Sequence, residues 1–145
     1  MRIVFFVINY NTDDHVIRLL ESIITANKFT NLDINVHVID NSKKTKDDED
    51  AFRKRVQLKG AFLHSTGDNL GYFGCIPIAQ NILEQYETDC VVYCNSDLYL
   101  NVDFFNELKS VLNYKRIVAP SIISIEEGFD QNPKYINRLS RIKMY

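Results

Sequence analysis

Four short apolar runs in this chain each end abruptly in polar residues. Runs of this length, bounded by turn-forming residues, are typical of buried strands. The runs and their polar ends are Val4–Ile8 with Asn9-Tyr10-Asn11, Val36–Ile39 with Asp40-Asn41-Ser42, Ala61–Leu63 with His64-Ser65-Thr66, and Val91–Cys94 with Asn95-Ser96-Asp97. Because ligands bind beyond the carboxyl ends of the strands in an open parallel sheet, these four ends predict a binding site.

Apolar residues at helical spacing separate the expected strands. Strands are expected at 2–8, 34–39, 61–64, 90–94 and 116–119, and helices at 16–24, 77–83, 102–112 and 134–145. Thr12 is a candidate cap for the first helix, and Pro77 suits the first turn of the second. This alternation predicts an α/β fold with a mainly parallel sheet flanked by helices, whose strand order the sequence leaves open.

The composition narrows the class of protein. A chain of 145 residues with 46% hydrophobic and 25% charged residues is typical of one globular domain, here residues 1–145. A net charge of −2 disfavours a nucleic-acid binder. No apolar stretch approaches the roughly 18 residues that a membrane span needs. The first apolar run breaks at Asn9 and lacks a cleavage site, so we expect a cytoplasmic protein without a signal peptide.

Three features have a plain structural interpretation. The three cysteines cannot all pair within one chain, and we expect Cys75, Cys90 and Cys94 to be packing residues in a reducing compartment. The three histidines lack metal-ligand spacing, although His64 follows a strand near the expected site. The charge-dense stretch 43–50 is expected to be a solvated loop or the start of a helix.

Several common nucleotide-binding and hydrolytic motifs do not occur in the sequence. A Gly-x-Gly-x-x-Gly turn does not follow the first strand, which disfavours a dinucleotide-binding fold. The chain also lacks the Gly-x-x-x-x-Gly-Lys-Ser/Thr loop of the P-loop NTPases and the Gly-x-Ser-x-Gly turn of the α/β-hydrolases.

Four segments in order resemble the family 2 glycosyltransferases with the GT-A fold, especially the rhamnosyltransferase-like branch. They are Val7-Ile8-Asn9-Tyr10-Asn11, Val38-Ile39-Asp40-Asn41-Ser42, Asn69-Leu70-Gly71-Tyr72-Phe73-Gly74 and Asn95-Ser96-Asp97. The resemblance covers almost the whole chain and also includes 119–122 and 128–132. It implies a Rossmann-like GT-A fold that is incomplete at the C-terminus, with 133–145 as the start of a truncated acceptor-side region.

The resemblance also implies roles for the nucleotide-binding residues. Asn9, Tyr10 and Asn11 would line the base pocket, and Asp40 would hydrogen-bond the base or the ribose. Placed donors and acceptors in a mostly apolar pocket suit a UDP- or dTDP-linked sugar. Asp40 also suits a plain turn, because Asp-Asn-Ser is good turn chemistry.

The two remaining segments would face the diphosphate. Asn69 and Gly71 would approach the sugar-diphosphate region, where glycine permits a close backbone approach or a positive φ. Asn95 and Ser96 would line the same site. Asp97 would ligate Mg²⁺ or Mn²⁺, and the metal would neutralise charge on the leaving nucleoside diphosphate.

The sequence departs from the family in three places. Asn95 replaces the first carboxylate of the family's Asp-x-Asp motif, which implies a weaker metal affinity. Related chains usually place a glycine and then an asparagine shortly after the glycine loop, whereas this chain reads Cys75-Ile76-Pro77. The family's catalytic base lies in an acceptor-binding part that this chain does not reach, so no catalytic residue is assigned. We therefore expect a truncated protein or a donor-binding half, which would leave apolar surface uncovered and favour self-association into a homo-oligomer.

Three functions remain open at this point. The first is an inverting, metal-assisted glycosyltransferase, or a part of one, that transfers a sugar to a glycan acceptor in polysaccharide biosynthesis. The second is a non-catalytic nucleotide-sugar-binding module or a degenerate fragment without a base. The third is another α/β domain, such as a nucleotidyltransferase or a phospho-receiver. The sequence after the first strand lacks the Gly- and Arg-rich loop of the former, and the chain lacks the late lysine of the latter.

Overall fold

The computed structural model describes residues 1–111, 117–118, 120–125 and 128. The chain divides into two units, Met1–Ser110 and Val111–Tyr145, and the expectation of a single domain stays a prediction. The helices and strands are β1 (Arg2–Asn9), α1 (Asp13–Asn27), β2 (Asp33–Asp40), α2 (Lys46–Gln57), β3 (Phe62–Ser65), α3 (Gly71–Gly74), α4 (Ile76–Leu83), β4 (Cys90–Asn95) and α5 (Phe104–Val111).

The four strands form one parallel sheet in the order β3-β2-β1-β4. The α/β fold with a parallel sheet that the sequence predicts is therefore confirmed. The register aligns Asn9 with Asp40, Asp40 with Ser65, and Ile8 with Asn95. Because the strands run in the same direction, their polar ends meet at one edge of the sheet.

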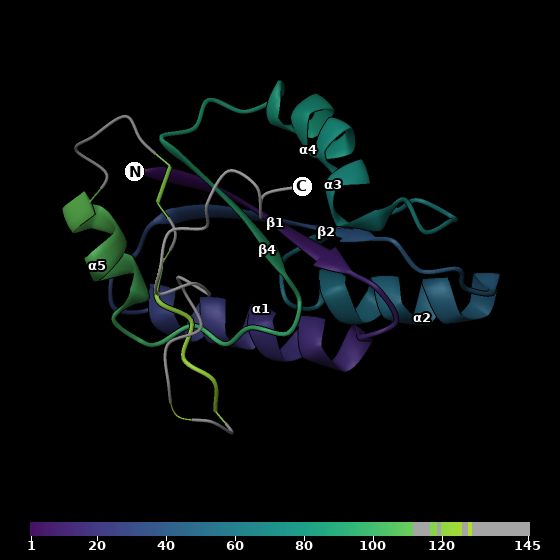
Figure 1. The fold of residues 1–145 in the computed structure, drawn as a ribbon, viewed down its shortest axis with the longest axis horizontal. Helices are drawn as coiled ribbons and strands as arrows, with labels where there is room; N and C mark the ends of the chain where they lie inside the picture. Colours follow the sequence, from purple (N-terminus) through teal and green to yellow (C-terminus); the bar gives the residue numbers. More distant parts are fainter. Residues whose placement is uncertain (112–116, 119, 126–127, 129–145) are drawn as a thin grey trace, which may run out of the picture. The chain divides into compact units, whose positions relative to one another are not determined.

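The central strand β1 sorts the core into two layers. Residues 3–8 are all buried, which is expected of a strand covered on both faces. Ile3, Phe5 and Val7 pack with α1, α2 and Phe105 of α5. Val4, Phe6 and Ile8 pack on the other face with residues of α4. Figure 1 shows α1 and α2 on one side of the sheet and α3 and α4 on the other.

Most of the expected elements are found within a few residues of their predicted bounds. The charge-dense stretch is a helix start: Thr45 caps α2, its side-chain oxygen accepting a hydrogen bond from the Asp48 backbone N–H at 3.2 Å. The expected strand 116–119 is only partly among the described residues, and the expected helix 134–145 lies wholly outside them. Within the described part of the chain, no helix is both long and apolar enough to cross a membrane.

The three cysteines are free thiols. Burial raises the pKa of each, and it raises that of Cys94 to about 12. A thiol with a raised pKa is a poor nucleophile at neutral pH. Cys75 belongs to one hydrophobic cluster and Cys90 and Cys94 pack against the other, so the expectation that they are packing residues is confirmed, and the reducing compartment stays a prediction.

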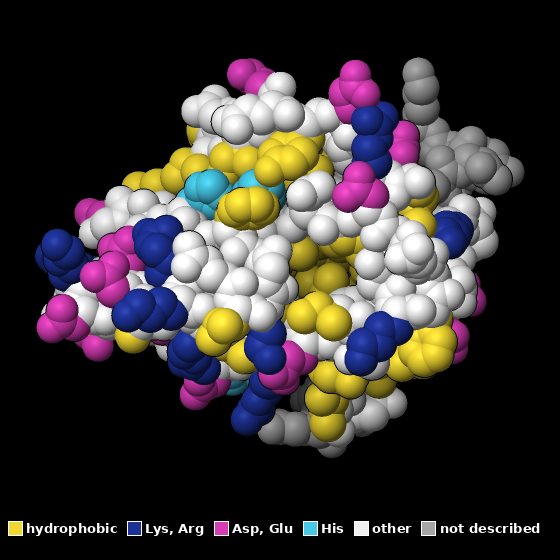
Figure 2. All heavy atoms as spheres, turned by 180° about the vertical axis from the view of Figure 1, so that it is seen from behind, with side chains coloured by type: hydrophobic (Ala, Val, Ile, Leu, Met, Phe, Trp, Pro, Cys, Tyr) yellow, Lys and Arg dark blue, Asp and Glu magenta, His cyan; other side chains and the backbone are white. Residues whose placement is uncertain are grey.

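His37 of β2 is a buried histidine at the β3 side of the sheet. Its ring stacks between Phe6 and Phe62, at centroid distances of 5.6 and 5.0 Å, and meets the edge of Tyr86. Its Nδ1 lies 2.9 Å from Nε2 of His64, whereas its own Nε2 is buried without a hydrogen-bond partner. Figure 2 shows histidine side chains set among hydrophobic ones on this face. Burial lowers the pKa of His37 from 6.5 to about 4.

This environment predicts a loss of stability in mild acid. A histidine whose pKa is depressed by folding contributes stability above its unfolded pKa of 6.5, and that stability is lost as the pH falls toward 4. We expect the loss to be ~2–3 kcal/mol in the free energy of unfolding. Urea unfolding between pH 7 and 4 measures it, and the difference between the wild type and His37→Phe isolates it from the carboxylates. Parallel pH profiles in the two proteins would contradict the prediction.

Candidate functional site

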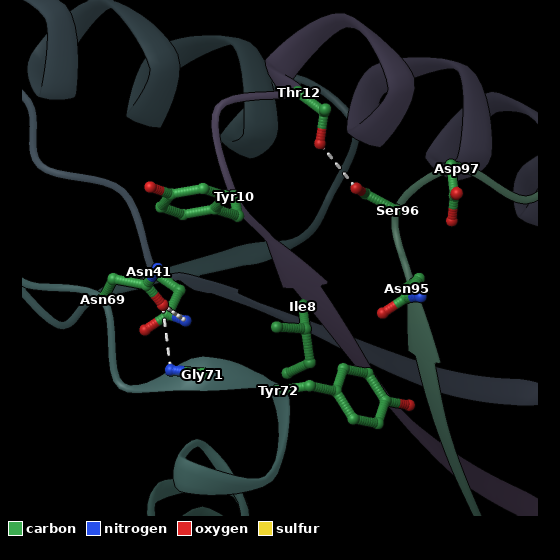
Figure 3. Close-up of a pocket in the computed structure, with 10 residues that line it drawn as sticks. All are labelled: Ile8, Tyr10, Thr12, Asn41, Asn69, Gly71, Tyr72, Asn95, Ser96 and Asp97. Atoms are coloured by element: carbon green, nitrogen blue, oxygen red, sulfur yellow. Dashed lines mark hydrogen bonds between the residues drawn. The ribbon is translucent and has the colours of Figure 1, made fainter.

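A cavity of about 380 Å³ opens at the carboxyl edge of the sheet. Its walls come from the ends of β1, β2 and β4 and from the segment that leads into α3 (Figure 3). The ten residues that line it are Ile8, Tyr10, Thr12, Asn41, Asn69, Gly71, Tyr72, Asn95, Ser96 and Asp97. A concave site with a few convergent polar groups on an apolar floor has the general character of a small-molecule site.

Six of the nine residues predicted from the sequence line this cavity. They are Tyr10, Asn69, Gly71, Asn95, Ser96 and Asp97. The other three, Asn9, Asn11 and Asp40, do not line it. Four lining residues carried no predicted ligand role: Ile8, Thr12, Asn41 and Tyr72. The structure thus brings the ends of β1, β2 and β4 together around one cavity. It places Asn9 and Asp40, two residues of the predicted base pocket, in the buried layer behind the cavity wall.

A compact ion cluster lies behind that wall. The Asp40 carboxylate is 1% exposed and accepts hydrogen bonds from Asn9 Nδ2 at 3.0 Å and from the Ser42 backbone N–H at 3.2 Å. Its other oxygen pairs with Lys44 Nζ at 2.6 Å, and this ammonium also lies 3.0 Å from Asp13 Oδ1. The Lys44 ammonium further lies 4.9 Å from the centre of the Phe52 ring. One carboxylate therefore connects β1, β2 and the entrance of α2.

These contacts bear on the predicted role of Asp40. Both carboxylate oxygens already have protein partners, and the side chain is almost wholly enclosed. The carboxylate could accept a further hydrogen bond, but a nucleotide could reach it only if the side chains that enclose it moved. The nucleotide contact of Asp40 stays a prediction, and what the geometry supports directly is a role in fixing the strand ends.

Thr12 joins the first strand end to the fourth. It occupies the N-cap position of α1, as expected, but its side chain makes no capping hydrogen bond. The Thr12 hydroxyl instead donates to Asn9 Oδ1 at 2.9 Å and lies 2.7 Å from the Ser96 hydroxyl. The expectation of a side-chain cap is therefore wrong, because Asn9 and Ser96 offer the hydroxyl closer partners. In Figure 3, a dashed line between Thr12 and Ser96 marks this contact.

The segment that enters α3 forms the opposite wall. Gly71 has a φ of 71°, in the left-handed region that favours glycine, and its backbone N–H donates to Asn69 Oδ1 at 2.9 Å. The positive φ expected at Gly71 is confirmed. Gly74 has an ordinary φ, but a Cβ there would lie 3.0 Å from Leu70 Cβ, so its lack of a side chain suits a close approach.

Tyr72 is held by a second tyrosine. The Tyr93 hydroxyl donates to the Tyr72 carbonyl at 2.7 Å, and the two rings meet edge to face at 5.0 Å. Burial raises the pKa of both phenols, which keeps them neutral at physiological pH. Tyr72 therefore contributes a fixed, uncharged surface beside Ile8.

The charge of the lining is unusual for a site expected to hold a diphosphate. Asp97 is the one carboxylate among the ten lining residues, and none of the ten is a lysine or an arginine. Among the described residues, no cluster of three or more His, Cys, Asp or Glu side chains could hold a metal. Mg²⁺, however, is commonly bound by one or two carboxylates together with water and substrate phosphates. Asp97, beside the amide of Asn95 and the hydroxyl of Ser96, fits that minimal set of oxygen donors.

Comparisons with known proteins identify a fold. No family model and no curated protein matches the chain. Among solved structures, it is similar to S. aureus TarS 1-349, with a TM-score of 0.57 and 21% identity over 78% of this chain and 32% of that one. The same protein in complex with UDP-GlcNAc matches with a TM-score of 0.56 and 19% identity, over 83% of this chain and 38% of that one.

A third similar structure is S. aureus TarS 1-349 in complex with UDP, with a TM-score of 0.54 and 20% identity over 83% of this chain. At such identities the likeness shows the fold alone, and it is a Rossmann-like glycosyltransferase fold. The chain spans 32% to 39% of the length of these three structures.

The ion cluster predicts a large effect of Asp40→Asn on stability. The change leaves the Lys44 ammonium, whose side chain is 11% exposed, with Asp13 as its remaining carboxylate partner. We expect the free energy of unfolding to fall by about 2–3 kcal/mol, since the buried ammonium loses the shorter of its two carboxylate contacts and keeps only the one to Asp13. Urea denaturation measures the change, and Asp40→Asn with Lys44→Met should recover much of it.

Asp14→Asn is the matched control for this experiment. Asp14 also pairs with a cation, Arg55, at 2.6 Å, but its side chain is 76% exposed. An exposed pair of this kind contributes less than about 1 kcal/mol. Equal losses for Asp40→Asn and Asp14→Asn would show that the buried cluster does not stabilise the strand ends.

Proposed function

We propose that this chain binds a nucleoside-diphosphate sugar in the cavity at the carboxyl edge of its sheet, as the donor-binding part of a glycosyltransferase. The observation that carries the proposal is the convergence of Tyr10, Asn69 and Asn95, from three separate segments, on one cavity. The fold adds support, because TarS structures with this fold are complexes with UDP-GlcNAc and with UDP.

The base and ribose belong, in this proposal, near Tyr10 and Asn41. The Tyr10 ring is exposed and lies over the cavity in Figure 3, which suits an aromatic base, and Asn41 forms part of the adjacent wall. Polar groups beside an aromatic ring suit a uracil or thymine edge, so a UDP- or dTDP-linked sugar is the proposed ligand. Asn9 and Asp40 support this wall from behind, and the exposed Asn11 is tied to Ser42 through its backbone N–H.

The diphosphate belongs between Asn69-Gly71 and Asp97. A diphosphate is strongly anionic, and the lining residues provide no cationic side chain to balance it. A divalent cation, Mg²⁺ or Mn²⁺, held by Asp97 would supply that charge and would stabilise the departing nucleoside diphosphate. Asn95, where a second carboxylate would bind more tightly, favours a weak metal site that forms together with the nucleotide.

The transfer step itself needs a base for the acceptor hydroxyl. Asp97 is the one carboxylate in the lining, and the proposal gives it to the metal. Transfer to a glycan acceptor, inversion at the anomeric carbon and a role in polysaccharide biosynthesis remain further proposals from the resemblance. The alternative that this observation favours is a nucleotide-sugar-binding module without catalysis, for which binding would occur but no sugar would leave the nucleotide.

Calorimetric titration of the purified chain tests the proposal. We expect UDP or dTDP to bind in the presence of Mn²⁺, with GDP binding at least about tenfold more weakly. Asp97→Asn should abolish the metal dependence. The control is Asp47→Asn, an acid-to-amide change in the first turn of α2, away from the cavity, which should bind like the wild type. Absence of binding by all three nucleotides in a sample folded by circular dichroism would refute the donor-site proposal.

A further inference from the structure

The three residues that end and follow β2 are polar yet almost wholly buried. Asp40, Asn41 and Ser42 are 1%, 2% and 3% exposed. Buried polar side chains persist where they are hydrogen-bonded, so each of the three is expected to have a partner. Each has one, and the partners belong to different segments: Asp40 contacts Asn9 of β1, Ser42 contacts the segment after β1, and Asn41 contacts the segment after β3.

Ser42 and the Asn41 backbone fix the segment after β1. The Ser42 hydroxyl accepts a hydrogen bond from the Asn11 backbone N–H at 2.7 Å. Asn11 has a φ of 55°, in the left-handed region that costs a non-glycine residue energy. The Asn41 backbone N–H donates to the Asn9 carbonyl at 2.8 Å. These bonds place Tyr10, which lies between the two anchored residues, beside the cavity.

The Asn41 side chain fixes the segment after β3. Its Nδ2 donates to Asn69 Oδ1 at 2.9 Å, and its Oδ1 accepts from the Leu70 backbone N–H at 2.8 Å. Asn69 Oδ1 in turn accepts from the Gly71 backbone N–H at 2.9 Å. The orientation of the Asn41 amide follows from this network, because the Leu70 N–H is a donor and must face an oxygen.

The other hydrogen bonds at the tip of this segment are local ones, from the Thr66 hydroxyl to the Asp68 carbonyl at 2.6 Å and from the Asn69 N–H to Asp68 Oδ1 at 2.9 Å. Residues 67–71 are exposed, and none of them belongs to either hydrophobic core cluster. At the base of the segment, Thr66 is tied to the end of β2 through its backbone N–H, which donates to the Asp40 carbonyl at 3.0 Å. A segment without buried apolar contacts is set by its hydrogen bonds. The amide of Asn41 is the buried group that bonds to Asn69 and Leu70 at the tip.

We propose that Asn41 is a positioning residue that holds 66–71 against the end of β2, and that it thereby sets the affinity of the cavity for the diphosphate part of its ligand. The inference rests on the proposed function for its ligand, but its structural part does not. It requires both functions of the amide: an oxygen for Leu70 and an N–H for Asn69. In Asn41→Asp, one carboxylate oxygen can still accept from the Leu70 N–H. The other oxygen faces Asn69 Oδ1, and the two oxygens repel each other.

Hydrogen exchange tests the structural part without any ligand. In the wild type, the backbone amides of Leu70 and Gly71 should be protected, because each donates a hydrogen bond in the Asn41–Asn69 network. In Asn41→Asp at pH 7.5 we expect protection of Gly71 to fall about tenfold, while amides of β1 keep theirs. Asn106→Asp, which adds the same charge on an exposed face of α5, should leave both amides unchanged. Wild-type protection at Gly71 in Asn41→Asp would overturn the proposal.

The pH profile of binding tests the functional part. A protonated carboxyl can donate to Asn69 Oδ1 as the amide does, so Asn41→Asp should regain affinity in acid. The measured quantity is the ratio of Kd values, Asn41→Asp over wild type, for UDP-GlcNAc with Mn²⁺. We expect a ratio of about ten at pH 7.5 that falls as the pH is lowered toward the pKa of the introduced carboxyl, which burial raises above its ordinary value of about 3.9. Using the ratio cancels effects of pH that the two proteins share, including the titration of His37.

The outcomes separate the two proposals. Failure of the wild type to bind refutes the proposed function, whereas the exchange result still decides the role of Asn41. Binding by the wild type with a ratio near unity at every pH overturns the inference alone. If Asn41→Asp does not fold, Asn69→Ala replaces it, since Asn69 is exposed and its removal takes the acceptor from Asn41 and Gly71. Full protection of Gly71 in Asn69→Ala would then overturn the inference.

Discussion

The buried carboxylate of Asp40 is the group on which the arrangement of the site depends. Its two oxygens connect the end of β1 through Asn9, the turn after β2 through the Ser42 backbone, and the entrance of α2 through Lys44. Parallel pairing of β1 with β2 would align these strand ends in any case. Pairing alone leaves the polar groups beyond the last ladder bond unsatisfied, and buried groups of this kind are costly. The ion cluster satisfies them, so the edge of the sheet can be rigid and polar at once.

The abrupt change from apolar to polar residues at this edge of the sheet explains how an open cavity can lie directly beside a buried core. β1 is covered on both faces, by α1 and α2 on one and by α4 on the other, and its side chains are apolar from Ile3 to Ile8. Ile8 is the last of these residues and forms the apolar floor of the cavity. Beyond it the chain turns polar within one residue, at Asn9. The boundary between core and site is therefore a single step along the strand, and it recurs at Asp40 of β2 and Asn95 of β4, the residues paired with Asn9 and Ile8.

The positions of the strand ends can be predicted from the sequence, whereas the contacts between them cannot. Apolar runs that stop in polar residues locate Tyr10, Asn69, Asn95 and Asp97 near one edge, because strand burial and parallel pairing are encoded locally. In the sequence, Lys44 is one cation of a charge-dense stretch, and nothing in the spacing shows that its ammonium contacts Asp40 and Asp13. Asn41 was hidden for a similar reason: an asparagine after a strand suits a turn, and only the fold brings Asn69 to it. The sequence predicts a cap at Thr12 because the start of a helix depends on local residues. The contact of Thr12 with Ser96 depends on the fold and cannot be predicted from the local sequence.

The use of Lys44 inside the protein has a consequence for charge at the cavity. Lys44 neutralises Asp40 and also contacts Asp13, so its positive charge is already balanced by two carboxylates before any ligand is considered. The lining then keeps one charge of its own, that of Asp97, and it has the same sign as a diphosphate. At a separation of a few ångströms, like charges repel each other, although solvent screens part of the repulsion because Asp97 is exposed. A cation that offsets Asp97 would favour an anionic ligand in this cavity, and this supports the metal dependence that we propose.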